Sequence, residues 1–477
     1  MLTDLPPGPQ LFLDDYFIES IKGVKRAMAA PRRHPEPVLS ETDEYTHLCH
    51  AVGLYSSDGV GCIGDGRFRM WYFVRSPLGK SHAYAESVDG VHWEKPTLGL
   101  VAVNGSYENN LLPTAQCGAT GYPITLLDNG PDFHDPSQRF MFLGCRLPDG
   151  GANLGAWAMF SADGIHLTSA PGNPVLPYEA WVWRENDQRE KRRLFYDHMD
   201  VFYDPARRRY VYITGMLAQP EDGYVGRSRT GSIRRLIGQC ESKDFLHWST
   251  PRRIMAPQHS EDMTEFYNMS VLCRNGLYIG FPRILRDDLP ADEGADVQGI
   301  GWTELAISRD GNNWTRLAGV FYDRSPNRND FDHAMAWLRS PVYAHDEMWF
   351  YYWGYDEGHK VGKRQIGLAR AKTDRFVALE SQEAEPGRVA TKVFGTACRR
   401  LSVNADADGG VRVRLLDSSG KVLPGYSFED CCPVEGDAVA HPIRWKNQVE
   451  LPDAKGSGIA IEIEIRRGSL YAVNLLG

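Results

Sequence analysis

Five short strand-like segments recur along this chain at intervals of about 70 residues. Each is rich in aromatic or β-branched residues, and several follow a tight turn such as Asp65-Gly66 or Asn275-Gly276. The segments are Phe68–Phe73, Phe140–Gly144, Tyr210–Ile213, Leu277–Phe281 and Met348–Tyr352. A repeat of this length is typical of radial or stacked arrays of one structural unit. We therefore expect five equivalent β units that close in a ring around one central funnel.

Each recurring segment lies between two further strand candidates. The upstream candidates are Cys49–Tyr55, Ile124–Leu127, Met199–Tyr203, Met269–Cys273 and Met335–Val342. The downstream candidates are His82–Glu86, Gly155–Phe160, Ile233–Cys240, Trp302–Ile307 and Gln365–Ala369. With one outer strand added, each group makes a four-stranded blade. The sequence thus predicts an all-β fold with a five-bladed β-propeller over residues 1–378, in which a strand at 10–19 is a candidate to close the ring.

The third strand of each blade runs into a turn of the form Ser-x-Asp-Gly-x-x-Trp, with variations. These turns are Ser87–Trp93, Ser161–Leu167, Ser242–Trp248 and Ser308–Trp314. The Ser and Asp side chains can bond the backbone of a tight turn, Gly supplies positive φ, and Trp packs between sheets. We interpret these turns as structural, and they resemble the Asp-boxes of sialidases and other propellers.

The pattern changes after the propeller. Residues 379–394 include the polar run Ser381–Arg388 and are predicted to form a linker. Beyond it, Val411–Leu416, Ile459–Ile465 and Leu470–Leu475 show strand patterns, with turn residues between them. This arrangement predicts a small antiparallel β-sandwich over residues 395–477.

Composition narrows the classes of partner. The chain has 477 residues and a net charge of −9, with no long Lys/Arg run, which argues against a nucleic-acid partner. It has no apolar stretch of the roughly 20 residues that span a bilayer, and its first residues lack the pattern of a secretory signal, so a cytoplasmic location is expected. Nine scattered cysteines suit reduced thiols. No Gly-rich phosphate loop is present, so no organic cofactor is implied.

Propeller geometry indicates where chemistry should lie. The start of each inner strand and the loop between the second and third strands of each blade share one face. Acids and imidazoles gather at four of these starts, which are Glu44–His47, Asp197–Asp200, Glu265–Asn268 and Asp330–His333. The loops of the same face add further polar residues, including Arg283, Asp287, Asp356 and His359.

Carboxylates crowded at one axis repel each other, which raises some of their pKa values and permits an acid/base pair at neutral pH. Glycoside hydrolysis needs such a pair, because one carboxylic acid protonates the leaving oxygen while a second activates water or attacks the anomeric carbon. The sequence therefore favours a glycosidase that acts on a small carbohydrate substrate.

The five-bladed plan with a trailing β-sandwich resembles the furanosidase clans of glycoside hydrolases, which include invertases, inulinases, arabinanases and β-xylosidases. Those families carry three acids at different strand entrances: a base or nucleophile, a pKa-tuning Asp and a general-acid Glu. His198–Asp204 is similar to their Asp-bearing entrance, and Glu265–Met269 to the entrance with the acid Glu. The chain lacks the Trp-Met-Asn-Asp-Pro-Asn-Gly, Arg-Asp-Pro and Glu-Cys motifs of the invertase type, so the resemblance is to a divergent relative.

The resemblance implies catalytic roles for three residues. Asp200 would tune a pKa or act as base, Glu265 would be the general acid, and Asp332 would be the third carboxylate, a role for which Glu44 is the other candidate. The expected substrate-binding residues are Glu44, His47, Asp197, His198, Tyr267, Asn268, Arg283, His333 and Asp356.

Two functions of other classes stay open. His47, His198 and His333 occupy equivalent entrances, each near an acid, and imidazole with carboxylate can bind a divalent ion. One alternative is therefore a metal-dependent sugar lyase or isomerase, although our assignment includes no metal. The other is a carbohydrate-binding propeller without catalysis. A homo-oligomer is also left open.

Overall fold

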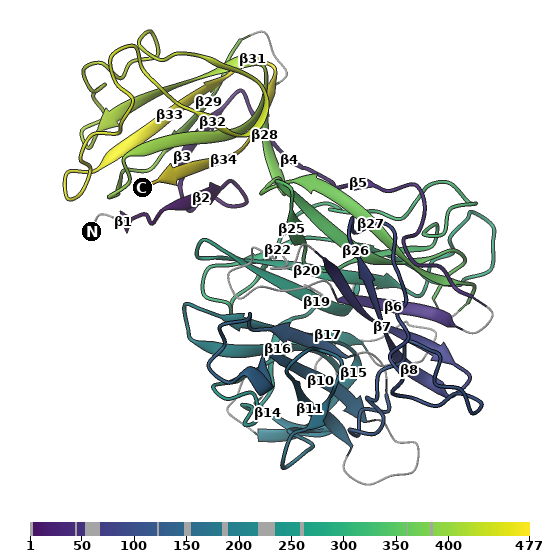
Figure 1. The fold of residues 1–477 in the computed structure, drawn as a ribbon. Coiled ribbons are helices and arrows are strands. Elements are labelled where there is room, and N and C mark those ends of the chain that lie inside the picture. Colours follow the sequence, from purple (N-terminus) through teal and green to yellow (C-terminus); the bar gives the residue numbers. More distant parts are fainter. Residues whose placement is uncertain are drawn as a thin grey trace. The chain divides into compact units, whose positions relative to one another are not determined.

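The computed structural model describes residues 3–42, 45–52, 67–121, 124–146, 154–183, 189–217, 234–257, 262–359, 361–381 and 385–477. These residues form strands and no α-helix, with one 3₁₀ turn, η1, at Pro136–Gln138 (Figure 1). The all-β class is confirmed. No helix in this part of the chain is long and apolar enough to cross a membrane.

The chain divides into two compact units. Unit 1 contains Met1–Ala30, Asp346–Met348 and Ala371–Gly477, and unit 2 contains Pro31–His345 and Trp349–Arg370. Every residue of the predicted catalytic set, Asp200, Glu265 and Asp332, belongs to unit 2.

Unit 1 is built around one large sheet. Its strands are β1 (Thr3–Asp4), β2 (Gly8–Leu11), β3 (Ile18–Lys22), β4 (Lys25–Met28), β28 (Val377–Ser381), β29 (Gly387–Thr391), β30 (Phe394–Gly395), β31 (Arg400–Asp417), β32 (Val434–Pro442), β33 (Ile459–Ile465) and β34 (Gly468–Leu476). The order is β1-β30-β33-β31-β34-β28-β4, with β2, β3, β29 and β32 paired alongside. Strand β33 alternates Ile with smaller or acidic residues, and its four Ile side chains are buried.

The N-terminal segment differs from our expectation of an outer strand for the ring. Within residues 10–19, β2 pairs with β34 and β3 pairs with β29, so both belong to unit 1. The physical reason is apolar burial, since Phe12, Phe17 and Ile18 lie in one core cluster with Leu475 and other residues of unit 1. The segment 379–394, expected as a linker, contains all of β29 and the end of β28.

The described residues of unit 2 form four sheets. The first is β6 (Thr46–Val52), β7 (Phe68–Ser76) and β8 (Gly79–Ser87). The second is β9 (Thr125–Asp128), β10 (Phe140–Arg146), β11 (Gly155–Ser161), β12 (Thr168–Ser169) and β13 (Leu176–Pro177). The third is β14 (Glu179–Trp183), β15 (Arg189–Asp204), β16 (Arg209–Leu217), β17 (Arg235–Ser242) and β18 (Arg252–Met255).

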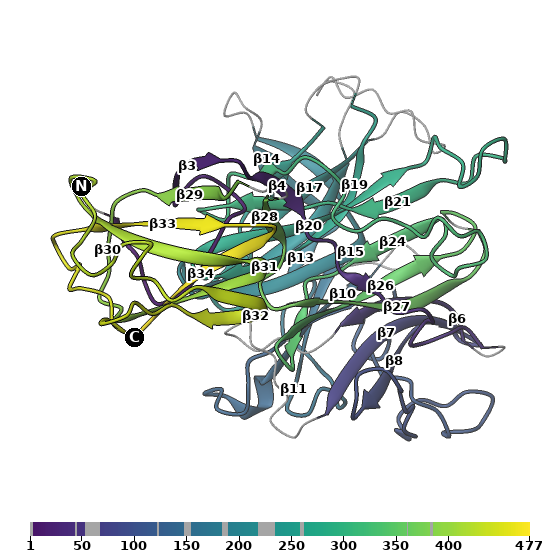
Figure 2. The same cartoon turned by 90° about the horizontal axis from the view of Figure 1, so that it is seen from above.

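The fourth sheet contains two groups of strands. They are β19 (Glu265–Arg274), β20 (Leu277–Arg286), β21 (Ile300–Thr303), β22 (Ala306–Ser308) and β23 (Thr315–Arg316), then β24 (Met335–Leu338), β25 (Val342–Ala344), β26 (Glu347–Tyr355), β27 (Arg364–Lys372) and β5 (Arg32–Arg33). One parallel pairing, Gly301 with Met335, joins the groups. Figure 2 shows the strands from above.

The five recurring segments are all strands with neighbours on both sides. They are β7, β10, β16, β20 and β26, and each pairs with the strand before it and the strand after it in its own group. Five separate apolar clusters each connect two groups of strands. The connected strands are β7–β8 with β26–β27, β7–β8 with β9–β11, β9–β11 with β15–β17, β15–β18 with β19–β22, and β19–β20 with β24–β26. Aromatic side chains at these strands therefore form the contacts between groups.

The Ser-x-Asp turns make the local hydrogen bonds that their sequence predicts. At the second turn, Ser161 Oγ accepts from Gly164 N at 2.9 Å, and Asp163 Oδ1 accepts from Ile165 N and His166 N at 2.8 and 2.9 Å. The backbone oxygen of Gly164 accepts from Trp71 Nε1 of β7 at 2.7 Å. The turn thus fastens one strand group to the next.

We expect Gly164→Ala to destabilise the fold by about 2–5 kcal/mol. Gly164 has φ +82°, where an L side chain costs about 1–2 kcal/mol, and a Cβ there would lie 2.7 Å from Trp71 Cζ2, which adds about 1–3 kcal/mol of overpacking. Gly172→Ala is the matched control, because Gly172 has φ +76° and no heavy atom within 4 Å of its added Cβ. Urea unfolding of both variants measures the difference, and equal losses would contradict the packing role of the turn.

Acid should weaken these turns. Burial raises the pKa of Asp163, but hydrogen bonds from His166, Ile165 and Ser161 outweigh it and lower the pKa to about 2. Because the folded pKa is below the unfolded one, the turn is stabilised above about pH 4 and loses this contribution as the pH falls toward 2. We expect the stability difference between wild type and Asp163→Asn to shrink from about pH 6 to about pH 3 in urea unfolding. A constant difference would contradict the assignment.

Candidate active site

Glu265 is the first residue of β19, and it is 3% exposed. Its carboxylate forms an ion pair with the guanidinium of Arg235, which is the first residue of β17 and is 6% exposed. The two strands belong to adjacent groups, so the starts of two strands from different groups meet here. A buried charge of this kind persists only when it is paired.

Two loop residues extend the cluster. Asp287 follows β20, and its Oδ2 lies 3.9 Å from the same Arg235 nitrogen. His359 follows β26, and its Nδ1 lies 2.7 Å from Asp287 Oδ1, while its Nε2 lies 3.3 Å from the hydroxyl of Tyr267. Both loop residues are buried. We define Glu265, Arg235, Asp287, His359 and Tyr267 as the Glu265 cluster.

The hydrogen-bond partners assign the tautomer of His359. An ionised Asp287 can only accept, so Nδ1 of the imidazole carries the proton and donates it to Asp287. Nε2 then accepts from the hydroxyl of Tyr267. His359 in this way fixes the orientation of Asp287 beside Arg235.

Tyr267 is packed more tightly than a sugar-stacking ring requires. It is 5% exposed and stacks on Trp337 with ring centroids 4.5 Å apart, while the ring of His359 meets its face edge-on at 5.4 Å. Arg235 also lies over it at 5.4 Å. Tyr267 was predicted to bind substrate, and these contacts give it the additional task of holding His359 and Arg235 in place.

The surroundings of Glu265 raise the pKa of its carboxyl group, as a general acid requires. Burial raises its pKa, Arg235 opposes that shift, and the nearby Asp287 charge raises the pKa further. Because desolvation is the largest of these effects, the net shift in the pKa of Glu265 is upward. A carboxyl group with a raised pKa can be protonated at a pH where an ordinary Glu is ionised, as a general acid requires.

Asp200 lies in a different cluster. It is fully buried in β15, forms an ion pair with Arg339 just after β24, and accepts from Val271 N of β19 at 3.2 Å. Three strand groups therefore converge on one carboxylate. Burial raises the pKa of Asp200, opposed by Arg339 and Arg283. This geometry makes Asp200 a junction of three strands.

Asp332 pairs away from both of these clusters. Its Oδ2 accepts from Arg33 Nε of β5 at 2.7 Å and from the hydroxyl of Tyr352 in β26 at 2.8 Å. Among the described residues no hydrogen bond or ion pair joins it to Glu265 or Asp200. Burial raises its pKa, against Arg33 and Tyr352. The predicted meeting of Asp332 with the other two acids is not among these contacts, in which Asp332 pairs with Arg33 of β5 and Tyr352 of β26.

The other predicted binding residues fall into three groups. Asn268 and Arg283 are fully buried and opposite each other in the β19–β20 ladder, and Arg283 Nε donates to Leu338 O at 3.1 Å. His333 contacts Asp292 at 3.0 Å, and Asp356 accepts from Lys363 N at 2.8 Å within its own loop. The third group consists of Glu44, which lies outside the described residues, and of His47, Asp197 and His198, whose strands are described but not their side chains.

The sequence reasoning passed over Arg235 and ranked Asp287 and His359 only as rim residues. Asp287 and His359 could be recognised as candidates because they lie in loops of the face that the propeller geometry assigns to function. Arg235 begins β17 directly before Leu236 and Ile237, and a charged residue at that place is a detectable irregularity. Within the described part of the chain, no group of three His, Cys, Asp or Glu side chains is placed to hold a metal ion.

No protein-family model matches this chain, and no curated protein matches it in sequence. Several solved structures are similar to it. One of them, a glycoside hydrolase, is 15% identical with a TM-score of 0.48, and the match covers 72% of this chain and 92% of that one. A β-fructofuranosidase of family GH32 from Bombyx mori is 12% identical with a TM-score of 0.42, covering 94% and 93%.

A third similar structure is an N-acetylgalactosamine deacetylase from F. plautii in complex with a blood group B trisaccharide. It is 14% identical with a TM-score of 0.41, and the match covers 74% of this chain and 97% of that one. The resemblance stated from the sequence thus reappears as a likeness to glycoside hydrolases, among them the GH32 enzyme.

Proposed function

We propose that the chain is a glycoside hydrolase that cleaves a small oligosaccharide or glycoside, with a furanoside as the first class to test. The observation that carries the proposal is the pair of carboxylates, Glu265 and Asp287, held on one guanidinium, that of Arg235. A pair of carboxyl groups with different environments is what glycosidic cleavage requires. The two lie at a strand start and a loop of the face that propeller geometry assigns to function.

We also propose the architecture that supports this site. The strand groups β6–β8, β9–β13, β14–β18, β19–β23 and β24–β27 with β5 are the five blades of a propeller, and the C-terminal residues from 395 form a β-sandwich. Support comes from the five apolar clusters between successive groups and from Tyr351 of β26, whose hydroxyl donates to Gly90 O in the first turn at 2.8 Å. That contact links the last group to the first.

In the proposed mechanism Glu265 donates its proton to the leaving glycosidic oxygen. Asp287 is the second carboxylate and activates water or attacks the anomeric carbon. His359 positions Asp287 through its Nδ1–H, and Arg235 stabilises the charge that Glu265 acquires when it gives up the proton. Asp200 is assigned a positioning role through the strands that it joins, and Asp332 is left out of the proton transfer.

Activity should fall as the pH rises through the pKa of Glu265, because only the protonated acid can donate. Burial raises the pKa of Glu265, so this alkaline limb is expected above the ordinary Glu value of about 4.3. A pH profile of kcat/KM measures it. A profile with no alkaline limb would contradict the role of Glu265.

The function itself is tested by hydrolysis of a panel of aryl fructosides, arabinofuranosides and xylosides. We expect cleavage of at least one class, unaffected by a chelator. Loss of activity with the chelator would point to the metal-dependent lyase or isomerase, and binding without cleavage of any glycoside would point to a carbohydrate-binding propeller. Either result would overturn the hydrolase.

A further inference from the structure

A polar pocket lies at the opposite end of β17 from the Glu265 cluster. Arg235 begins this strand and Glu241 lies six residues further along it, which at ~3.3 Å per residue separates the two sites by about 20 Å. The pocket has a volume of about 590 Å³. Its lining residues are Arg207, Arg209, Gln239, Glu241, Ser249, Thr250, Pro251, Arg252 and Asn312.

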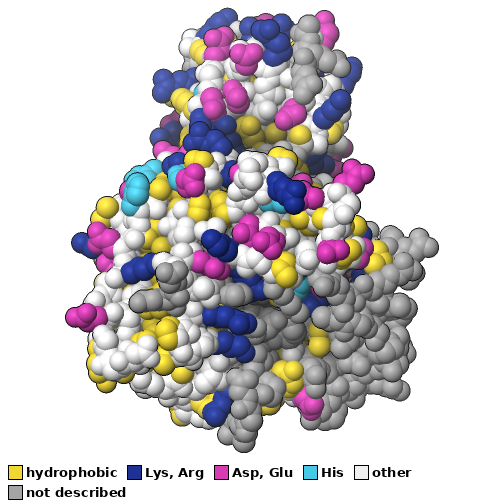
Figure 3. All heavy atoms as spheres, turned by 90° about the vertical axis from the view of Figure 1, so that its right-hand side faces the viewer, with side chains coloured by type: hydrophobic (Ala, Val, Ile, Leu, Met, Phe, Trp, Pro, Cys, Tyr) yellow, Lys and Arg dark blue, Asp and Glu magenta, His cyan; other side chains and the backbone are white. Residues whose placement is uncertain are grey.

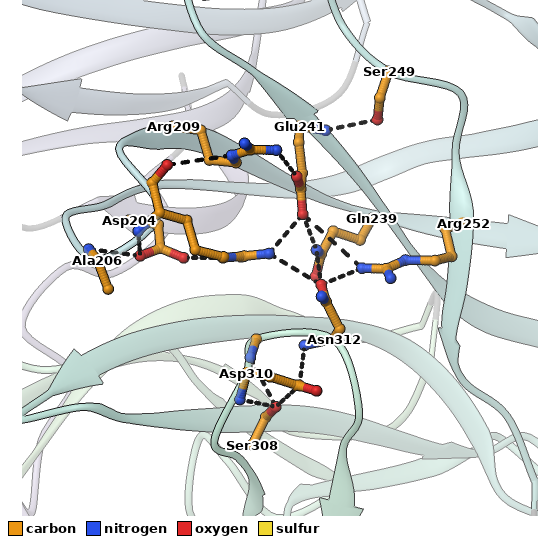
Figure 4. A network of polar contacts seen from close by, with 12 residues as sticks. Asp204, Ala206, Arg209, Gln239, Glu241, Ser249, Arg252, Ser308, Asp310 and Asn312 are labelled. Carbon is orange, nitrogen blue, oxygen red and sulfur yellow. Dashed lines mark hydrogen bonds and ion pairs between the residues drawn. The ribbon is translucent and has the colours of Figure 1, made fainter.

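A connected network holds the polar groups of this pocket in place (Figure 4). Glu241 accepts from Arg207 and from Arg209, both at 2.6 Å. Asn312 Oδ1 accepts from Arg207 at 3.0 Å, from Gln239 at 3.3 Å and from Arg252. The groups come from the turn after β15, the strands β16, β17 and β18, and the Ser-x-Asp turn after β22, so the fold builds the pocket from two strand groups.

The charge of the lining favours an anion. It contains three arginines and one glutamate, and the buried Asp204 behind it also pairs with Arg207, which leaves an excess of one positive charge. The side chain of Arg252 is the most exposed of the three at 48%, against 36% for Arg209 and 21% for Arg207. An arginine in this position can bind a carboxylate with two parallel hydrogen bonds.

Glu241 is the acceptor of this pocket that a ligand can reach. Its side chain is 18% exposed, whereas Gln239 is 2% exposed and its Oε1 has almost no accessible surface. The Nε2 of Gln239 donates to Glu241 and Asn312. A hydroxyl group can donate to the carboxylate of Glu241.

We propose that this pocket binds a sugar carboxylate, meaning a uronic acid. Arg252 and Arg209 would hold the carboxylate, while Glu241 would accept from hydroxyl groups. A sulfate dianion supplies no donor for Glu241, and a neutral sugar supplies no charge for the arginines, so neither matches both the cationic and the acceptor groups of the pocket. This site is independent of the function proposed for Glu265.

The test compares binding of D-galacturonate and D-glucuronate with that of D-galactose and D-glucose by titration calorimetry. The matched variants are Arg252→Gln and Arg253→Gln, since Arg253 is the next residue on β18 and does not line the pocket. We expect the wild type and Arg253→Gln to bind a uronate and the neutral sugars to bind at least tenfold more weakly. Arg252→Gln should lose about tenfold in uronate affinity, as expected for one charged hydrogen-bonding group.

Three results would overturn the proposal: no uronate binding by the wild type, equal affinity for the neutral sugars, or equal affinities of the two variants. A negative result would not contradict hydrolysis at Glu265, because the variants change β18 and leave the Glu265 cluster intact. A further titration with an oligogalacturonate identifies the source of the ligand. Tighter binding of the oligomer than of the monomer supports a polysaccharide, and equal binding supports a free sugar acid.

Discussion

Replacing Glu265 with Gln should lower kcat by about 10²–10⁴-fold, the usual contribution of a positioned acid or base. Gln keeps the size of the side chain but has no proton to give to a leaving oxygen. The fold should persist, because Arg235 keeps Asp287 as a second carboxylate 3.9 Å away. Substrate binding, measured by calorimetry with the inactive variant, should remain.

The matched control is Glu304→Gln. Glu304, which lies between β21 and β22, is also a buried glutamate, at 6% exposed, and it pairs with Arg316 at 2.5 Å. It is outside the Glu265 cluster, so this variant should lose stability without losing kcat. A kcat that falls equally in both variants would show that the loss from Glu265→Gln is structural.

The second large effect is on stability. Arg339→Met should destabilise the fold by about 3–5 kcal/mol, because it leaves the carboxylate of Asp200 buried without its partner. The loss should be smaller at low pH, since burial raises the pKa of Asp200 and its protonated form is neutral. Urea unfolding at two pH values measures both effects.

An exposed ion pair supplies the comparison. Arg399 and Glu450 lie 3.0 Å apart with side chains 51% and 56% exposed. Arg399→Met should cost no more than about 1 kcal/mol. The double variant Asp200→Asn with Arg339→Met should recover part of the loss. If Arg339→Met were as mild as Arg399→Met, Asp200 would not be the junction that we describe.

The strands of unit 2 were predictable because their apolar repeat is local. The segment Phe68–Phe73 and its four counterparts are strands with neighbours on both sides, and the Ser-x-Asp turns bond as their residues dictate. Turn chemistry and strand alternation act over a few residues, so one sequence is enough to read them. On the face shown in Figure 3, acidic and basic side chains of the described residues are interspersed.

The partners of the acids were not predictable in the same way. Asp332 pairs with Arg33, which is 299 residues away, and Asp200 with Arg339, which is 139 away. Nothing local in the sequence selects these arginines. The N-terminal strand β2 likewise pairs with β34 at the far end of the chain. Glu265 could be proposed from the sequence because its place in the repeat set its face, whereas Arg235 could not, because it is neither an acid nor an imidazole and does not start an inner strand.

The most direct test of Glu265 as the proton donor compares leaving groups in Glu265→Gln. A dinitrophenyl glycoside leaves as a stable anion and needs little protonation, whereas an alkyl or sugar leaving group needs a full proton. We predict that kcat/KM for the variant falls by less than about tenfold on the dinitrophenyl glycoside and by about 10²–10⁴-fold on the matched alkyl glycoside. Equal losses on the two substrates would contradict the assignment of Glu265 as general acid.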